Sequence, residues 1–210
     1  MNRKIAIPFL FIASLICFAV TAALHNNAFS ADSIRQDYLH DVSEITERLH
    51  FSIDKAHAQA QRLSPMLGDN TISFSDLLQK SDYPVFIYRA GQLVFWSNHT
   101  IIPQPDLVQR QKDVFAVENE YGRFIVVPQQ VRQYLVQVYI PLQVDYHINN
   151  PYLTPKLDDE VFNQTDVRLI LDADAPYPHV RTRDGHFLFA IDFENDRKAD
   201  SSKQLQLIIF

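Results

Sequence analysis

An uncharged segment near the N-terminus constrains this chain more than any other feature of the sequence. No charged residue occurs from Ile5 to Leu24. A helix of this length, rising about 1.5 Å per residue, crosses the hydrocarbon core of a bilayer, which is about 30 Å thick. Arg3 and Lys4 precede the segment, and the positive-inside rule then leaves residues 1–4 in the cytoplasm. The sequence therefore predicts a transmembrane helix over residues 5–24, with the chain beyond it outside the cytoplasm.

A cleaved signal peptide is the alternative interpretation of this segment. Ala28-Phe29-Ser30 has the small-x-small pattern of a cleavage site. The apolar region of a signal peptide usually runs for about 7–15 residues, so we favour an uncleaved membrane anchor. Both interpretations place the rest of the chain outside the cytoplasm.

A long amphipathic helix is predicted over residues 31–64. Its apolar residues recur at spacings of three and four and form one stripe: Tyr38, Val42, Ile45, Leu49, Ile53, Ala56, Ala60 and Leu63. Ser64-Pro65 ends the helix, because the residue before a proline avoids the α region. The stripe either packs along the chain's own domain or pairs with a second copy in a parallel homodimer. His50 and His57 are poorly spaced for sharing one metal ion and are interpreted as surface residues.

Strand patterns follow this helix. Short runs rich in β-branched and aromatic residues lie at 85–88, 93–96, 114–117, 124–127, 134–142, 167–171, 179–183 and 186–193. A helix followed by antiparallel strands predicts the α+β class. Residues 65–163 are expected to form the core of the domain, and residues 164–204 a set of membrane-proximal strands.

The apolar residues at 205–210 are too few to span a bilayer, which needs about 20. They are either a buried final strand or the start of a second transmembrane helix. Because they follow abruptly on a polar, charged stretch at 195–203, we interpret them as the start of a membrane helix.

Composition excludes several classes of function. The formal net charge of −6 argues against a general nucleic-acid binder, whose affinity comes from basic residues. The 4 Gly residues are too dispersed for a Rossmann or P-loop phosphate site. Cys17 is the single cysteine, so neither an intrachain disulfide nor a cysteine metal site is expected.

No catalytic motif is recognisable, so the sequence predicts no catalytic residue, no cofactor and no enzymatic activity within these 210 residues. His179, Asp184 and His186 flank one predicted hairpin, and two of them could together bind a metal ion. We favour a plain exposed hairpin and predict no metal site.

Four aromatic residues on neighbouring predicted strands suit a small-molecule pocket: Tyr88, Trp96, Tyr134 and Tyr139. The alternative is that they are ordinary core and edge aromatics. For Trp96 we expect a buried structural anchor, because the apolar residues 93–95 before it imply cover on both faces of the hairpin. Ser97 and Asn98 are then expected to fix the strand exit by bonding nearby backbone.

Two stretches of the predicted sheet follow a distinctive pattern, one from Phe86 to Ser97 and one from Ile140 to Leu153. The positions that carry it are Phe86, Tyr88, Leu93, Trp96, Ser97, Tyr146, Asn150, Tyr152 and Leu153. Behind an anchor and a long helix, this pattern resembles the sensor region of membrane-bound two-component histidine kinases from Bacteroidetes. The resemblance implies a PAS-like or Cache-like domain between two membrane helices. It also implies an inner-membrane protein whose main domain lies in the periplasm.

The sequence thus supports two functional hypotheses. The first is the signal-input domain of a transmembrane histidine kinase, in which the intact protein would carry a kinase module beyond Phe210. Its expected partners are the membrane, a second copy of the chain and a small-molecule ligand, with no nucleic acid. The second is an anchored or secreted periplasmic binding or interaction protein without a kinase module.

Overall fold

A computed structural model describes residues 14–18, 21, 31–67, 74–98, 101, 113–145 and 155–193. The chain divides into two units at Asp41/Val42. In the first unit the described residues are helical and include the start of α2 (Ala31–Leu63). Within the described residues, no helix is long and apolar enough to cross a membrane. The predicted membrane segments at 5–24 and 205–210 lie mostly or wholly outside these residues.

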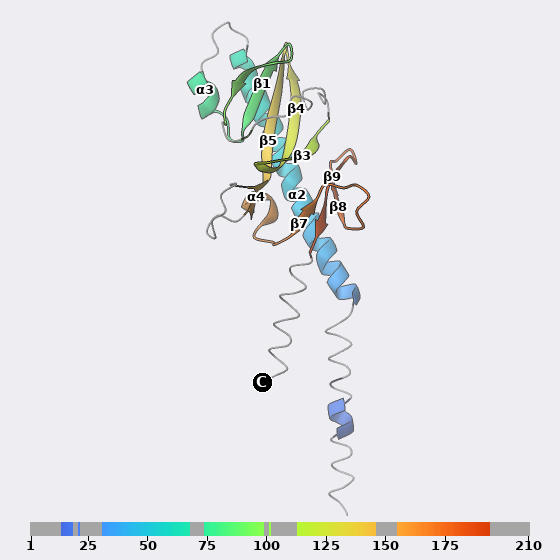
Figure 1. The fold of residues 1–210 in the computed structure, drawn as a ribbon. Coiled ribbons are helices and arrows are strands. Elements are labelled where there is room, and N and C mark those ends of the chain that lie inside the picture. The colour runs from blue at the N-terminus through green and yellow to red at the C-terminus, as the bar shows by residue number, and fades with distance from the viewer. Residues whose placement is uncertain are drawn as a thin grey trace, which may run out of the picture. The chain divides into compact units, whose positions relative to one another are not determined.

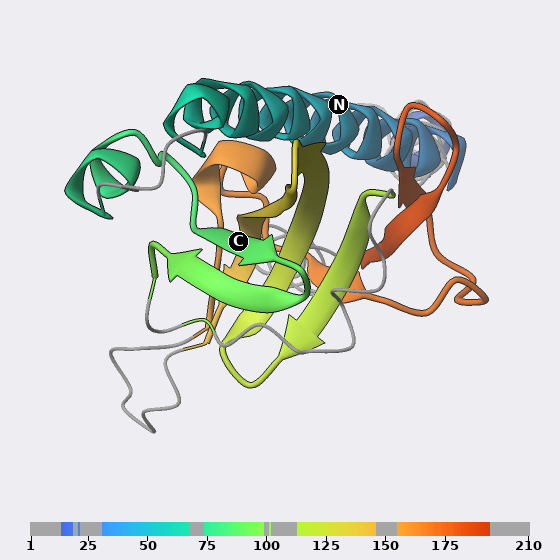
Figure 2. The same ribbon diagram turned by 90° about the horizontal axis from the view of Figure 1, so that it is seen from above.

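The long helix α2 is confirmed, and a 3-10 turn (Ser64–Leu67) follows it. In the second unit its apolar stripe is at most 8% exposed: Val42, Ile45, Leu49, Ile53, Ala56, Ala60 and Leu63. Figure 2 shows the helix running along one face of the larger sheet. The stripe therefore packs against the chain's own domain. Of the two alternatives for the stripe, packing along the chain's own domain is the one found from Val42 to Leu63, and a homodimer of the protein stays a prediction.

The larger sheet is entirely antiparallel (Figure 1). Its strands are β1 (Val85–Arg89), β2 (Gln92–Trp96), β3 (Phe115–Asn119), β4 (Gly122–Val131), β5 (Tyr134–Val144) and the short β6 (Lys156–Leu157). They are ordered β2-β1-β5-β4-β3, with β6 paired to β5. The strands β2 and β3 are consequently the two edges. The α+β class is confirmed.

Strand register assigns the buried residues to two faces. Phe86 pairs with Gln137 and Tyr88 with Leu135, so these residues share one face. That face carries an aromatic cluster made of Phe86, Tyr88, Ile101, Phe115, Val117, Phe124, Val126, Leu135 and Tyr139. No residue of α2 belongs to the cluster, so the helix covers the opposite face, where Val85 pairs with Val138.

Gln59 fixes α2 to the segment that enters the sheet. Its side-chain Nε2 donates a hydrogen bond to the Tyr83 carbonyl at 2.9 Å, and its Oε1 accepts from the backbone N–H groups of Tyr83 (2.8 Å) and Asp82 (2.9 Å). Gln59 is fully buried. A buried amide with its hydrogen bonds made sets the axial position of the helix more sharply than apolar packing alone.

A second, smaller antiparallel sheet lies beside α2 (Figure 1). Its strands are β7 (Arg168–Ile170), β8 (His179–Arg181) and β9 (Phe187–Asp192), ordered β7-β9-β8. The short helices are α3 (Phe74–Gln79) and α4 (Asp159–Phe162). Asp158 caps α4 by accepting from the backbone N–H groups of Glu160 and Val161. The sequence patterns predicted these strands but not their division between two sheets.

Two tight turns of the larger sheet require unusual backbone. Ala90 (φ 49°) and Gly91 (φ 79°) form the β1–β2 turn, in which both central residues have positive φ. Gly122 (φ 136°) begins β4 at a point where an added Cβ would collide with the Gln143 carbonyl. Glycine is required at Gly122 by contact as well as by conformation.

Candidate functional site

Three of the four predicted pocket aromatics are core residues. Tyr139 is 0% exposed, with its ring centroid 4.9 Å from that of Phe86 and 6.2 Å from that of Phe124. Tyr88 is buried in the same cluster, while Tyr134 is buried outside it. Burial raises the pKa of Tyr88 to about 12 and raises the pKa of Tyr139 further. Among the described residues, the Tyr139 hydroxyl has no hydrogen-bond partner.

Trp96 is not the buried anchor that the sequence predicts, since it is 45% exposed. It lies on edge strand β2 and packs edge-on against Phe74, with ring centroids 6.3 Å apart. Leu93 and Val94 are also exposed, whereas the β1 run 85–88 is buried. The prediction that both faces of this hairpin are buried is therefore correct for β1 and wrong for β2. A run of apolar residues looks the same in sequence whether its strand is central or at the edge of the sheet.

The predicted strand exit is confirmed at Ser97. Its hydroxyl accepts a hydrogen bond from the backbone N–H of Val85 at 2.8 Å, and its own N–H donates to the Val85 carbonyl at 2.9 Å. Ser97 therefore extends the pairing of β2 with β1 by one residue. The remaining pattern positions lie outside the described residues: Tyr146, Asn150, Tyr152 and Leu153.

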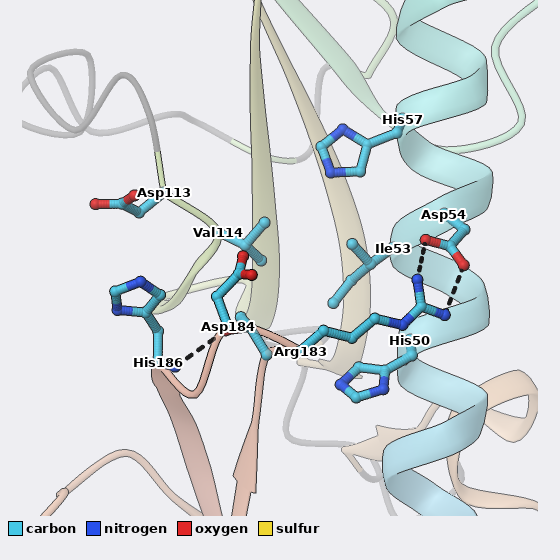
Figure 3. Close-up of a pocket in the computed structure, with 10 residues that line it drawn as sticks. His50, Ile53, Asp54, His57, Asp113, Val114, Arg183, Asp184 and His186 are labelled. Atoms are coloured by element: carbon cyan, nitrogen blue, oxygen red, sulfur yellow. Dashed lines mark hydrogen bonds and ion pairs between the residues drawn. The ribbon is translucent and has the colours of Figure 1, made fainter.

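The structure forms a groove that the sequence did not predict, between α2 and the β8–β9 hairpin (Figure 3). We call it the hairpin groove. Its volume is about 380 Å³, and its lining comprises His50, Ile53, Asp54, His57, Asp113, Val114, Thr182, Arg183, Asp184 and His186. The volume falls within the range of small-molecule sites, roughly 300–1,000 Å³.

Helix and turn geometry bring these residues together. His50, Asp54 and His57 are spaced by four and three, which places them along one side of α2. On the opposite wall, Gly185 (φ 87°) permits the tight turn between β8 and β9. The His186 backbone N–H donates to the Thr182 hydroxyl at 3.0 Å, which closes this turn and presents Arg183 and Asp184 toward the helix.

Two contacts join the walls of the groove. Arg183 donates to both carboxylate oxygens of Asp54, at 2.8 and 2.9 Å, and this hydrogen bonding raises the pKa of Arg183. His50 Nε2 donates to the Arg181 carbonyl at 2.9 Å. These contacts hold the hairpin against the helix.

Four lining side chains have no hydrogen bond or ion pair with the described part of the chain: His57, Asp113, Asp184 and His186. Figure 3 shows His57 and Asp184 projecting from opposite walls toward the space between them. Among the described residues, no group of three His, Cys, Asp or Glu side chains is placed to hold a metal ion. His179 does not line the groove, and its ring nitrogens lie at 3.1 Å from the Ala175 carbonyl and 3.0 Å from Arg181 Nη2.

Sequence reasoning treated His50 and His57 as surface residues and missed the groove. A partial signal was present in the spacing of His50, Asp54 and His57 on one helix side. The other wall is more than a hundred residues away in sequence, and no local pattern indicates that contact. Comparison of the chain with protein-family models, with curated proteins and with solved structures finds no match.

Proposed function

We propose that this chain is the extracytoplasmic signal-input domain of a membrane-anchored histidine kinase. The uncharged segment at 5–24, the long helix that follows it and the antiparallel sheet support the proposal. The pattern at 86–97 and 140–153 supports the finer PAS-like or Cache-like assignment by resemblance alone. The proposal places residues 31–204 in the periplasm.

The observation that carries the proposal is the pair of contacts across the hairpin groove. Asp54 and His50 belong to the helix that follows the predicted anchor, and Arg183 and Arg181 belong to the hairpin that precedes the predicted second membrane helix. A ligand in the groove with different affinities for two arrangements of these walls would shift their populations. The signal would pass to the two membrane segments that flank the domain in sequence.

An anchored periplasmic interaction protein is the second candidate. Exposed apolar residues on α3 and on the edge strand β2 favour it: Phe74, Leu78, Leu93, Val94 and Trp96. Contiguous exposed apolar surface often marks a protein contact. This function needs no coupling between the groove and the membrane segments, and that difference separates the two candidates.

A chimera tests the proposal. Residues 1–204 are joined to the second membrane helix and kinase module of a well-characterised sensor kinase with a reporter gene. Arg183→Ala and Asp54→Ala should each shift basal reporter output, because each removes the ion pair that joins the hairpin to α2. The control is Arg123→Ala, which removes an ion pair with Glu118 on β3–β4, away from the groove. Equal output from all variants would contradict the proposal.

Membrane topology is tested separately. Alkaline phosphatase fused after Asp200 should be active, and a fluorescent protein that folds only in the cytoplasm should be dark at the same position. The reverse pattern would place the domain in the cytoplasm and exclude both candidates.

A further inference from the structure

We propose that the outer edge of β2 is a dimer interface, at which this strand pairs antiparallel with the β2 strand of a second copy of the chain. The inference does not rest on the proposed signal-input function, and it concerns a surface that the signalling mechanism does not use. It follows from the open edge of β2, the bulge at Val94, the absence of charge along the strand and the apolar side chains beside it.

The outer side of β2 is an open strand edge. In the larger sheet β2 pairs with β1, and within the described part of the chain no strand pairs with its other side. An edge strand presents a row of backbone N–H and C=O groups that have no partner in their own sheet. These groups form hydrogen bonds with an extended backbone that lies alongside, so the edge fits another strand.

Val94 is the extra residue of a β-bulge on this edge. Its two neighbours, Leu93 and Phe95, pair with adjacent residues of β1, which are Tyr88 and Ile87. The extra residue of a bulge is left unpaired within its own sheet. A bulge also increases the local twist of the strand, which limits pairing with another chain to a few residues. We therefore place the centre of the interface at Val94.

Exposed apolar side chains are concentrated beside this edge. Of the eight large hydrophobic residues that are exposed in the described part of the chain after residue 30, five lie on α3 or β2: Phe74, Leu78, Leu93, Val94 and Trp96. The ring centroid of Phe74 lies 4.7 Å from that of Phe95 and 6.3 Å from that of Trp96, so α3 and β2 form one surface. Contiguous apolar surface of this kind marks protein contacts.

A second copy is the partner that this edge fits. An antiparallel pair of identical strands is symmetric, so the same edge serves both chains of a twofold dimer. No charged residue occurs from 90 to 98, although the whole chain carries a net charge of −6. Two copies therefore meet at this edge without repulsion between like charges. The strand also lacks the lysine or proline with which edge strands commonly prevent such pairing.

The size of the surface implies a weak dimer. The five side chains are between 36% and 52% exposed and offer roughly 400 Å² of apolar area per copy, since a fully buried aromatic residue contributes about 150–250 Å². Stable complexes bury about 800 Å² per partner. We therefore expect the copies to pair where the predicted anchors concentrate them in a membrane, and to separate in dilute solution.

Crosslinking of the full chain in lipid vesicles tests the inference. Val94→Cys is introduced in a Cys17→Ser background, and a short thiol-reactive crosslinker is added. Paired strands lie about 4.8 Å apart, so two copies of Val94→Cys should be joined. The matched control is Phe51→Cys in the same background. Phe51 is 65% exposed but lies on α2, so its variant should form dimers only at the level of random collisions.

A charge placed on the edge should block the dimer. Leu93→Lys puts a positive charge on each copy, and like charges that face each other across a strand pair are unfavourable. This change should reduce the crosslinking of Val94→Cys about fivefold. Tyr177→Lys, at an exposed position between β7 and β8, should leave it unchanged. Retained far-ultraviolet circular dichroism identifies the variants that remain folded.

The emission of Trp96 gives an independent readout. Trp96 is exposed when the copies are separate, and the second copy would cover part of its ring. Its emission should therefore shift to shorter wavelength as the ratio of protein to lipid rises. Leu93→Lys should remove this shift.

Three results would overturn the inference: equal crosslinking of Val94→Cys and Phe51→Cys, crosslinking that Leu93→Lys leaves unchanged, or, in cell membranes, joining of Val94→Cys to a different protein instead of a second copy. The last result would assign this edge to the interaction protein of the second candidate function. The signal-input function is judged separately by the chimera, whose variants Arg183→Ala and Asp54→Ala leave β2 unchanged.

Discussion

Arg183 and Asp54 form a two-point contact between residues 129 positions apart in the sequence, and this contact joins the β8–β9 hairpin to α2. Both side chains are largely exposed, so its effect on stability is small. A double-mutant cycle with Arg183→Ala and Asp54→Ala in urea should give a favourable but small coupling energy, as expected for an exposed ion pair. Amide hydrogen exchange in the hairpin should rise in both variants. A coupling energy of zero with unchanged exchange would contradict this role.

Replacing the buried amide of Gln59 should destabilise the domain strongly. Gln59→Leu removes three hydrogen bonds and leaves the Tyr83 N–H and C=O groups buried without those partners. We expect a loss of about 3 kcal/mol in the free energy of unfolding. Gln61→Leu, at an exposed position of the same helix, should change it by less than about 0.5 kcal/mol. Similar losses for the two variants in chemical denaturation would contradict this role of the Gln59 amide.

Two glycines provide a matched test of backbone strain. Gly91→Ala places a side chain at positive φ in open space and should cost about 1–2 kcal/mol. Gly122→Ala adds the collision with the Gln143 carbonyl to an unfavourable φ, so its loss should be larger. Thermal unfolding of both variants gives the comparison. If the two losses are equal, the approach of β4 to β5 is looser than described.

Buried tyrosines should make the domain unstable in alkali. Burial raises the pKa of Tyr88 to about 12, so the unfolded chain releases this proton first as the pH rises. The contribution of Tyr88 to stability is complete below about pH 10, the pKa of an unperturbed tyrosine. It should fall between about pH 10 and pH 12, because the folded state binds more protons there. Tyr88→Phe should lose less stability over this interval, measured by urea unfolding at each pH.

The sequence contains 1 Trp, so tryptophan emission, excited at wavelengths that tyrosine does not absorb, reports on Trp96 alone. Its exposure on β2 predicts a red-shifted emission that acrylamide quenches readily. Phe95, its buried neighbour, provides the contrast. Phe95→Ala should cost about 3–5 kcal/mol through lost burial and a cavity, and Trp96→Ala considerably less. A blue, poorly quenched emission would show that another surface covers Trp96.

Local patterns predicted most of the elements of this fold. The three-and-four spacing of apolar residues predicted α2, and Asp184-Gly185 marked the β8–β9 turn correctly. These signals are local, because helix or strand periodicity and turn conformation depend on residues that are close together in the sequence. The separation of β7, β8 and β9 into their own sheet depends on pairings that no local pattern specifies.

The candidate site was predicted much less well than the fold. Tyrosine suits both pockets and cores, and composition alone does not separate these environments, so the sequence predicts a pocket role for Tyr88 and Tyr139 that their burial contradicts. The hairpin groove depends on the contact of Asp54 with Arg183 across the chain. Such contacts depend on how complete elements of secondary structure pack together. The sequence alone shows that Asp54 and Arg183 are present but not that they meet.

The burial of α2 limits how this helix can move. Rotating it about its own axis would bring Ile45, Leu49 and Leu63 out of the core into water, at about 1.5–3 kcal/mol for each fully buried side chain. Rotation would also separate Gln59 from the Tyr83 backbone. The part of the helix from Val42 to Leu63 should therefore shift together with the larger sheet as one rigid body.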